Sequence, residues 1–146
     1  MKFKKVSVFI LAILIMLSSN SHVSASVVTP NASLYLSRYI AYIYPESDEE
    51  LSIWFEVQGT ETMDEIGVLS IRLQEKANTS SEWKTVKTFN HYDYSNLLGY
   101  DTNFYYSSVD YSGKEGYSYR ADLTIWAGKA GNGDSRSYLT DTVVAE

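Results

Sequence analysis

The chain of 146 residues contains no cysteine and has 18 acidic against 12 basic residues, a net charge of −6 at pH 7. The missing cysteines exclude disulfides, thiol catalysis, thiolate metal sites and an acylated N-terminal cysteine. The acidic balance argues against nucleic acid or an anionic membrane as the partner, and it also keeps a small domain soluble.

The first residues have the three parts of a secretory signal peptide. A start with three lysines is followed by an apolar run over residues 6–17 and by small residues up to Ala25. A membrane-spanning anchor is the alternative, but it needs about 20 apolar residues. We therefore expect residues 1–25 to be removed and residues 26–146 to form a single secreted, extracellular domain without membrane contact. Its charge would be 9 − 18 = −9, because the three lysines leave with the signal.

Alternation of apolar and polar residues predicts strands along most of the remaining chain. They are predicted over residues 34–44, 51–58, 66–76, 83–89, 104–111, 116–127 and 135–144. Residues 59–65 are predicted to break the pattern, and residues 91–101 fit either a short helical turn or a looped crossover. Which face of residues 83–89 points inward stays open.

The segment 116–127 is predicted to be a central strand with one solvent-exposed face, and a hairpin signal follows at residues 131–134. Gly116 and Tyr119 have the spacing with which immunoglobulin-like sandwiches enter their penultimate strand, where the tyrosine hydroxyl bonds to the corner backbone. No long helical stripe is present. The sequence therefore predicts an all-β fold, an antiparallel immunoglobulin-like β-sandwich of about seven strands.

Five short segments, spread over most of this domain, are similar to segments of a known protein family. They are residues 62–67, Trp83 with residues 86–89, residues 96–100, residues 107–109 and residues 133–136. Together they resemble a family of small secreted proteins of Gram-positive bacteria that is classed as a domain of unknown function. That family often has methionines where Leu97 and Leu98 stand, and its resemblance does not extend to the N-terminal lead-in. The resemblance implies secretion and an immunoglobulin-like sandwich, and it implies no activity.

Candidate catalytic and metal-binding residues are few. His91 is the only histidine outside the predicted signal, and it lies in a predicted loop without a nucleophile-elbow pattern or enough partners for zinc. Asp64 and Glu65 are the most suggestive carboxylate pair for glycoside hydrolysis, but Asp64 also fits a turn cap that accepts nearby backbone N–H groups. The acidic turns at residues 47–50 and 132–134 lack the spacing of a recognised calcium loop, and calcium binding there stays open. We therefore expect no enzyme activity and no cofactor.

Two tryptophans are the best candidates for a binding surface. If the aliphatic residues of their strands point inward, Trp54 and Trp126 must point outward. An outward tryptophan can stack on a sugar ring or anchor a protein partner, unless a loop, a tyrosine or an arginine such as Arg120 covers it. The leading hypothesis is a protein-interaction or adhesion-type module. The alternative is a carbohydrate-binding module that uses Trp54 or Trp126, so the expected partner is an extracellular protein or a glycan.

Overall fold

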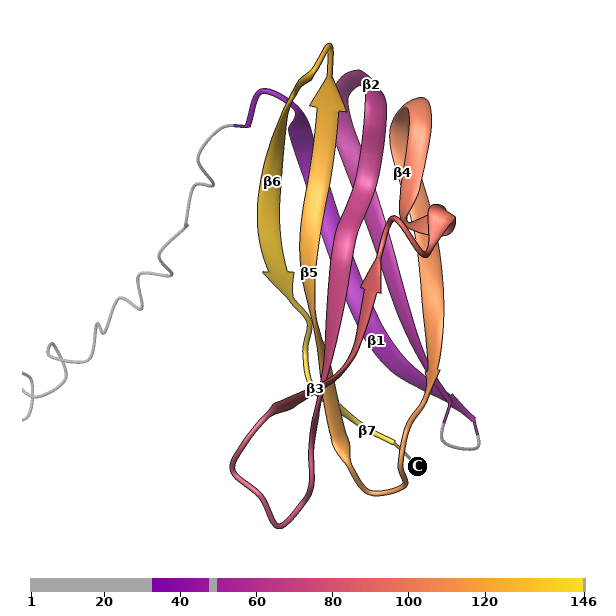
Figure 1. Cartoon of the computed structure of the whole chain (residues 1–146), viewed down its shortest axis with the longest axis vertical. Coiled ribbons are helices and arrows are strands. Elements are labelled where there is room, and N and C mark those ends of the chain that lie inside the picture. The colour runs from indigo at the N-terminus through magenta and orange to yellow at the C-terminus, as the bar shows by residue number, and fades with distance from the viewer. Residues whose placement is uncertain (1–32, 48–49, 146) are drawn as a thin grey trace, which may run out of the picture. The chain divides into compact units, whose positions relative to one another are not determined.

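A computed structural model describes residues 33–47 and 50–145 (Figure 1). Its elements are β1 (Leu36–Ser47), β2 (Glu50–Lys76), β3 (Lys84–Asn90), the 3-10 helix η1 (Ser95–Leu97), β4 (Leu98–Ser112), β5 (Ser118–Lys129), β6 (Asn132–Leu139) and β7 (Val143–Val144). The predicted signal at residues 1–25 and the lead-in up to residue 32 lie outside this description. Within the described ranges, no helix is long and apolar enough to cross a membrane.

The seven strands form one antiparallel sheet that curls into a half-barrel, so the predicted all-β antiparallel fold is confirmed. β2 is its organising strand. The first half of β2 pairs with β1 on one side and with β4 on the other. The second half pairs with β5 on one side, and with β3 and the start of β4 on the other. β6 and β7 then pair with β5.

The predicted break at residues 59–65 does not separate two strands, because β2 continues through it from Glu50 to Lys76. The break shows instead as a register shift between Gln58 and Met63 in the pairing with β4. Here the chain folds closely on itself, since a Cβ at Gly59 would lie 2.9 Å from Cγ of the fully buried Met63. The two halves of β2 therefore serve different parts of the sheet.

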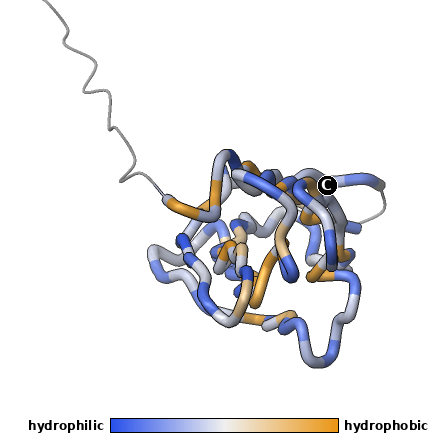
Figure 2. Tube along the Cα trace, turned by 90° about the horizontal axis from the view of Figure 1, so that it is seen from above, coloured by the Kyte–Doolittle hydropathy of each residue, from blue (hydrophilic) through white to orange (hydrophobic). Residues whose placement is uncertain are grey.

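The inward faces of residues 51–58 and 116–127 are those that the alternation predicted. In residues 66–76 the alternation places Leu69 with Ile71 and Leu73, but Leu69 is only half-buried, because a register shift between Val68 and Ser70 turns Val68 inward instead. The aliphatic and aromatic rows of β2 and β5 are fully buried: Leu51, Ile53, Phe55, Val57, Ile66, Val68, Ile71, Leu73, Tyr119, Ala121, Leu123, Ile125 and Ala127. Seen from above, several hydrophobic stretches of the chain lie near the middle of the molecule (Figure 2). Burial of such side chains contributes about 1.5–3 kcal/mol each, which makes this core the main source of stability.

The predicted tyrosine corner is present at the entry to β5. Tyr119 is fully buried, and its hydroxyl accepts the backbone N–H of Lys114 at 2.9 Å. The same hydroxyl donates to a carboxylate oxygen of Glu75 at 3.0 Å. Gly116 supplies the turn before the strand with a φ of +75°. The corner thus ties the turn before β5 to the end of β2.

Several boundaries differ from the prediction. The helical turn is η1, and β4 begins at Leu98, well before the predicted start at residue 104. The hairpin between β5 and β6 turns at Ala130 and Gly131, both at positive φ, so the turn begins one residue before the predicted signal at residues 131–134. The predicted last strand is two strands, because the chain leaves β6 after Leu139 and Thr140 bonds back to Ala121. Such limits depend on partners across the sheet, which a period-two pattern does not contain.

The open face of residues 83–89 is also settled. Phe89 of β3 is buried in the core opposite Ile71, and Lys87 lies on the same inward side opposite Leu73. A register shift follows between Leu73 and Gln74, which allows Val86 to pack against the core as well. This mixed pattern explains why neither face of the segment is uniformly apolar.

Candidate functional site

Trp126 lies on the outer face of β5, as predicted. Its neighbours Ile125 and Ala127 are fully buried, whereas Trp126 is half-buried. The indole lies over two glycines. A Cβ at Gly128 would come within 2.7 Å of Cζ2 of the ring, and one at Gly133 within 2.5 Å of Cη2. The absence of side chains at these two positions therefore makes room for the ring and fixes its place on the sheet.

The Trp126 ring lines a hollow of about 340 Å³ at the turn between β5 and β6, which we call the Trp126 hollow. The hollow is lined by Asp64, Glu65, Trp126, Gly128, Lys129, Gly131 and Asn132. It combines one aromatic ring with carboxylate and amide groups that hydrogen-bond well, a composition suited to a polar ligand with an apolar face. The indole Nε1 is buried and has no hydrogen-bond partner within the described residues.

Asp64 forms a cap, but not the predicted local one. Its carboxylate accepts the backbone N–H of Ala130 at 2.7 Å, in the turn between β5 and β6. Beside it, Lys129 forms an ion pair with Glu61 at 2.5 Å. β2 and the hairpin are therefore joined directly at the Trp126 hollow, which holds the rim of the hollow in place.

Trp54 also points to the outer face, as predicted, and is half-buried. Its ring stacks on Tyr42 of β1, with ring centroids 5.9 Å apart and an interplanar angle of 21°. On the other side, the residue paired with Trp54 is Ser108 of β4, whose side chain is small. One side of the indole is therefore covered by a tyrosine, while the other faces a short neighbour.

Exposed aromatic residues surround Trp54 in a pattern that sequence reasoning missed. On the same outer face, the exposed fractions are 49% for Tyr42, 41% for Tyr44, 41% for Phe104 and 62% for Tyr106. Tyr106 and Phe104 reach this face because the register pairs them with Glu56 and Gln58 of β2. We call Tyr42, Tyr44, Trp54, Phe104 and Tyr106 the aromatic face. Their alternation in β1 and β4 was the signal that could have revealed it.

The structure does not bring Trp54 and Trp126 into one site. Trp54 belongs to the half of β2 that pairs with β1 and β4, whereas Trp126 pairs with Gly67 in the other half and with Ser135 of β6. Arg120, considered as a cover for these rings, instead lies with its guanidinium carbon 4.2 Å from the ring centroid of Trp83. The two candidates are thus separate surfaces.

His91 contacts a backbone carbonyl group and a tyrosine ring. His91 is half-buried, with Nδ1 3.0 Å from the carbonyl oxygen of Leu69 and its ring 3.9 Å from that of Tyr92. Residues 48 and 49 of the first acidic turn lie outside the description. Among the residues that are described, no group of three His, Asp or Glu side chains is placed to hold a metal ion.

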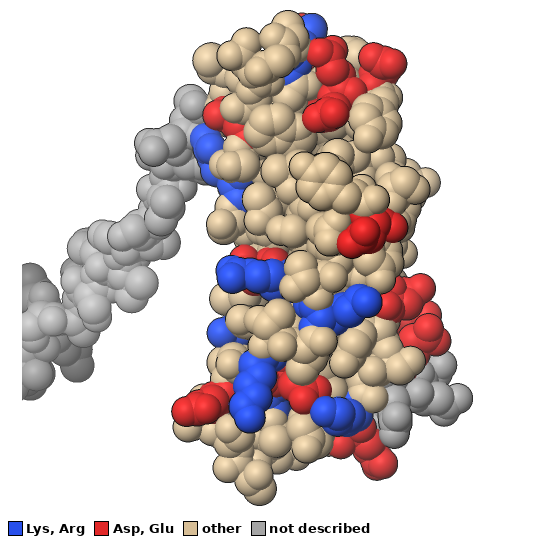
Figure 3. Space-filling view, in the orientation of Figure 1, with Lys and Arg blue, Asp and Glu red and all other residues tan. Residues whose placement is uncertain are grey.

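The charged side chains alternate in sign over much of one face (Figure 3). Arg72 pairs with Asp122, and Arg136 lies 3.9 Å from Asp134. Positive charge on this face is thus interrupted by acids. The strongest titration shift lies at the tyrosine corner, where burial raises the pKa of Tyr119 well above its usual range. The hydrogen bond to Glu75 also raises the pKa of Lys114.

No protein-family profile and no curated protein matches the sequence. Several solved structures, among them the following three, align with it at low similarity. The sporulation control protein Spo0M from Bacillus subtilis aligns with a TM-score of 0.39 and 13% identity, over 75% of this chain and 50% of its own. A family 76 glycoside hydrolase from a bovine Bacteroides thetaiotaomicron strain aligns with a TM-score of 0.31 and 17% identity, over 74% of this chain and 20% of its own.

The third is a protein from Archaeoglobus fulgidus, with a TM-score of 0.28 and 8% identity, over 76% of this chain and 98% of its own. The chain thus spans half the length of the first structure and a fifth of the second. These similarities are too distant to carry any information on activity, so function has to be argued from the surfaces described above.

Proposed function

We propose that the protein is a secreted, non-catalytic binding domain that recognises a glycan through the Trp126 hollow. The observation that carries this proposal is the placement of Trp126 over Gly128 and Gly133, beside Glu65 and Asn132. A ring held in this way loses little freedom on binding, and it offers an apolar surface to the C–H groups of a sugar. Carboxylate and amide groups at the rim then form hydrogen bonds with the sugar hydroxyls.

The Trp126 hollow favours a neutral or cationic sugar over an acidic one. Asp64 and Glu65 contribute two carboxylates to its lining and Lys129 one ammonium. Because that ammonium already pairs with Glu61, the hollow has excess negative charge, which would repel a uronic acid or a sulfated glycan. Neutral hexoses and amino sugars are therefore the ligands to test first.

The test is calorimetric titration of the purified protein with neutral and chitin-derived oligosaccharides, together with co-sedimentation on insoluble cell-wall polysaccharide. Trp126→Ala should weaken binding at least about tenfold, equivalent to about 1.4 kcal/mol. Trp54→Ala is the matched control, since it removes the same side chain from another surface. Equal affinity of Trp126→Ala and the unaltered protein would overturn the glycan assignment.

A second candidate function is protein recognition by the aromatic face, as in an adhesion-type module. Four of its side chains are more than two-fifths exposed, and contiguous apolar side chains on a sheet face are typical of protein interfaces. The two functions differ in what they bind on a cell. If the aromatic face acts, we expect binding to Gram-positive cells to be lost after protease treatment of the cells and in the double variant Tyr42→Ser/Tyr106→Ser. If the Trp126 hollow acts, binding should be lost after periodate treatment of the cells and in Trp126→Ala.

We further propose that the half-barrel is a variant of the immunoglobulin-like sandwich and that residues 1–25 are a cleaved signal. The tyrosine corner at Tyr119 supports the sandwich, because it ties the turn before β5 to the end of β2. The basic start and apolar run support the signal. Mass spectrometry of the protein recovered from culture medium should give an N-terminus at Ser26, and an uncleaved chain would contradict it.

A further inference from the structure

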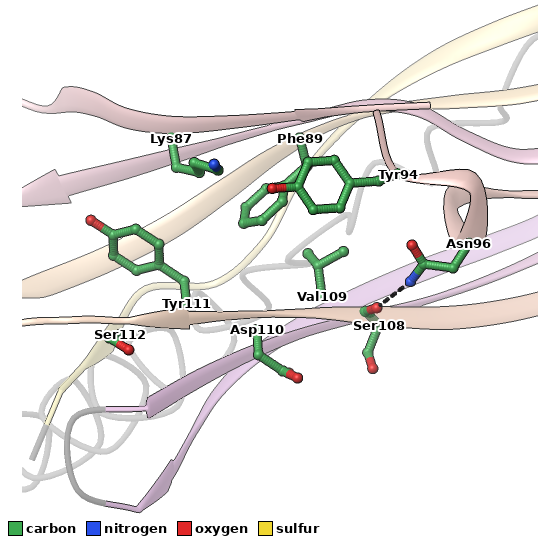
Figure 4. Close-up of a pocket in the computed structure, with 9 residues that line it drawn as sticks. All are labelled: Lys87, Phe89, Tyr94, Asn96, Ser108, Val109, Asp110, Tyr111 and Ser112. Carbon is green, nitrogen blue, oxygen red and sulfur yellow. Dashed lines mark hydrogen bonds between the residues drawn. The ribbon is translucent and has the colours of Figure 1, made fainter. Parts of the chain in front are cut away.

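β3 and β4 border an opening in the half-barrel where neither strand pairs with the other. Within the described residues, each of them pairs only with β2 on this side of the sheet, and η1 connects them at one end. A groove of about 540 Å³ lies between them, with residues of both strands facing it (Figure 4). We call this opening the β3–β4 groove.

The edge of β4 presents backbone groups to the β3–β4 groove. The side-chain amide of Asn96 donates to the carbonyl oxygen of Ser108 at 2.8 Å, so this carbonyl points away from β2. In an antiparallel pair the backbone groups of alternate residues point the same way. The N–H and C=O of Asp110 and the N–H of Ser112 therefore point into the groove too. Asn96 closes the η1 end, and the end at Ser112 is left for entry.

The edge of β3 is arranged in the same way. The backbone N–H of His91 donates to Leu69 of β2 at 3.0 Å, so His91 and Phe89 direct their backbone groups toward β2. The alternate residue, Thr88, therefore directs its N–H and C=O away from β2, along the free edge of β3. Within the described residues, a free edge of β3 and a free edge of β4 thus border the same opening.

The side chains between these edges form an apolar floor with one cation at the rim. Phe89 and Val109 are 2% and 5% exposed, and the half-buried Tyr94 and Tyr111 flank them (Figure 4). The Lys87 ammonium lies 5.5 Å from the ring centroid of Phe89 and 5.7 Å from that of Tyr94. None of the ion pairs within the described residues includes Lys87, so its charge is left for an incoming carboxylate.

We propose that the β3–β4 groove binds one extended peptide segment of another protein by strand addition. The segment would pair with the backbone of Asp110 and Thr88, place an apolar side chain over Phe89 and Val109, and bring an acidic side chain to Lys87. A strand edge of a second folded copy does not fit, because it stays attached to its own sheet whereas the groove has strands on both sides. The occupant is therefore a flexible segment that becomes ordered on binding, at a site separate from the Trp126 hollow.

The test uses the fluorescein-labelled octapeptide Ser-Glu-Thr-Phe-Thr-Val-Thr-Ser and the purified protein. Its Glu, Phe and Val alternate on one face, as an added strand requires. A second peptide carries the same side chains but N-methyl groups on alternate residues, which removes backbone donors. Anisotropy should show saturable binding of the first peptide in the micromolar range and loss of binding for the second.

Two variants examine the site itself. Asp110→Pro removes an N–H that points into the groove, at an edge position where proline is tolerated, and should weaken binding at least about fivefold. Lys87→Glu should weaken it by a similar factor, whereas Lys84→Glu, a charge reversal on β3 outside the groove, should not. Trp126→Ala should retain full peptide affinity, which separates this site from the glycan proposal. No saturable binding, equal binding of the N-methylated peptide, or unchanged affinity in both Asp110→Pro and Lys87→Glu would each overturn the proposal.

Discussion

Replacement of Tyr119 by Phe removes one hydroxyl from the tyrosine corner and leaves the buried ring in place. The hydroxyl accepts from the Lys114 backbone N–H at 2.9 Å and donates to Glu75 at 3.0 Å. Glu75 keeps a second donor, the Lys114 ammonium at 2.9 Å. The Lys114 N–H has no such substitute and loses its acceptor. The main penalty is therefore one unsatisfied backbone donor, about 1–3 kcal/mol of unfolding free energy.

Urea unfolding at neutral pH, followed by circular dichroism, measures this loss. With a slope of about 2 kcal/mol per molar urea, a loss of about 2 kcal/mol lowers the midpoint by about 1 M. The control is Tyr92→Phe, because Tyr92 is 87% exposed and its variant should change stability by less than about 0.5 kcal/mol. If Tyr119→Phe shifts the midpoint no more than Tyr92→Phe does, the hydroxyl does not hold the corner and the reasoning is refuted.

The remaining predictions concern the same corner at high pH, a close backbone approach and a covered tryptophan. Because burial raises the pKa of Tyr119, the folded state favours the neutral phenol. The stability that this preference contributes is complete below pH about 10 and is lost as pH rises further. Above pH about 10 the urea midpoint of the unaltered protein should therefore fall more steeply than that of Tyr119→Phe, and parallel curves would contradict this expectation. Gly67→Ala, at φ +146° with its Cβ 2.2 Å from the Leu97 carbonyl oxygen, should be destabilised by more than the about 1–3 kcal/mol of backbone strain alone. Gly131→Ala, at φ +78° with no atom within 4 Å of its Cβ, is the matched control in urea unfolding, and equal losses would disprove a role of the contact. Arg120→Ala should uncover the Trp83 ring and reduce the free energy of unfolding by about 0.5–1 kcal/mol. In a variant without the other two tryptophans, the Trp83 fluorescence should shift to the red. Unchanged emission would show that the guanidinium does not cover the ring.

The sequence predicts those parts of the fold that depend on alternation alone. Residues 51–58 and 116–127 bury the predicted faces because a strand places every second side chain on the same side. The course of residues 59–65 was not predictable, since its pairing depends on which strands lie beside β2. Residues 135–144 likewise divide where Thr140 finds a partner in Ala121 across the sheet. Local pattern thus gives the faces of strands, whereas tertiary pairing sets where strands end.

The candidate sites show the same division. The outward direction of Trp54 and Trp126 follows from their strands, but their surroundings come from residues far away in the sequence. Tyr42 covers one side of Trp54 from β1, and Gly133 makes room for Trp126 from β6. The sequence gives no means of pairing Arg120 with Trp83 rather than with either of these rings. Predicting exposure therefore needs the register, which no single strand contains.

The β3–β4 groove follows from the path of β4 rather than from a local lack of side chains. Leu98–Thr102 of β4 pair with Gly67–Met63 of β2, and from Phe104 onward the strand pairs with the first half, with Asp101, at φ 51°, close to this change. β3 occupies the place beside the second half that β4 leaves. Two strands that were joined at η1 thus diverge with their edges facing each other, and larger side chains on the floor would not satisfy the backbone groups along those edges. An added strand would satisfy them in regular alternation along both edges, and for this reason we expect the groove to select its ligand by backbone pairing first and by side chains second.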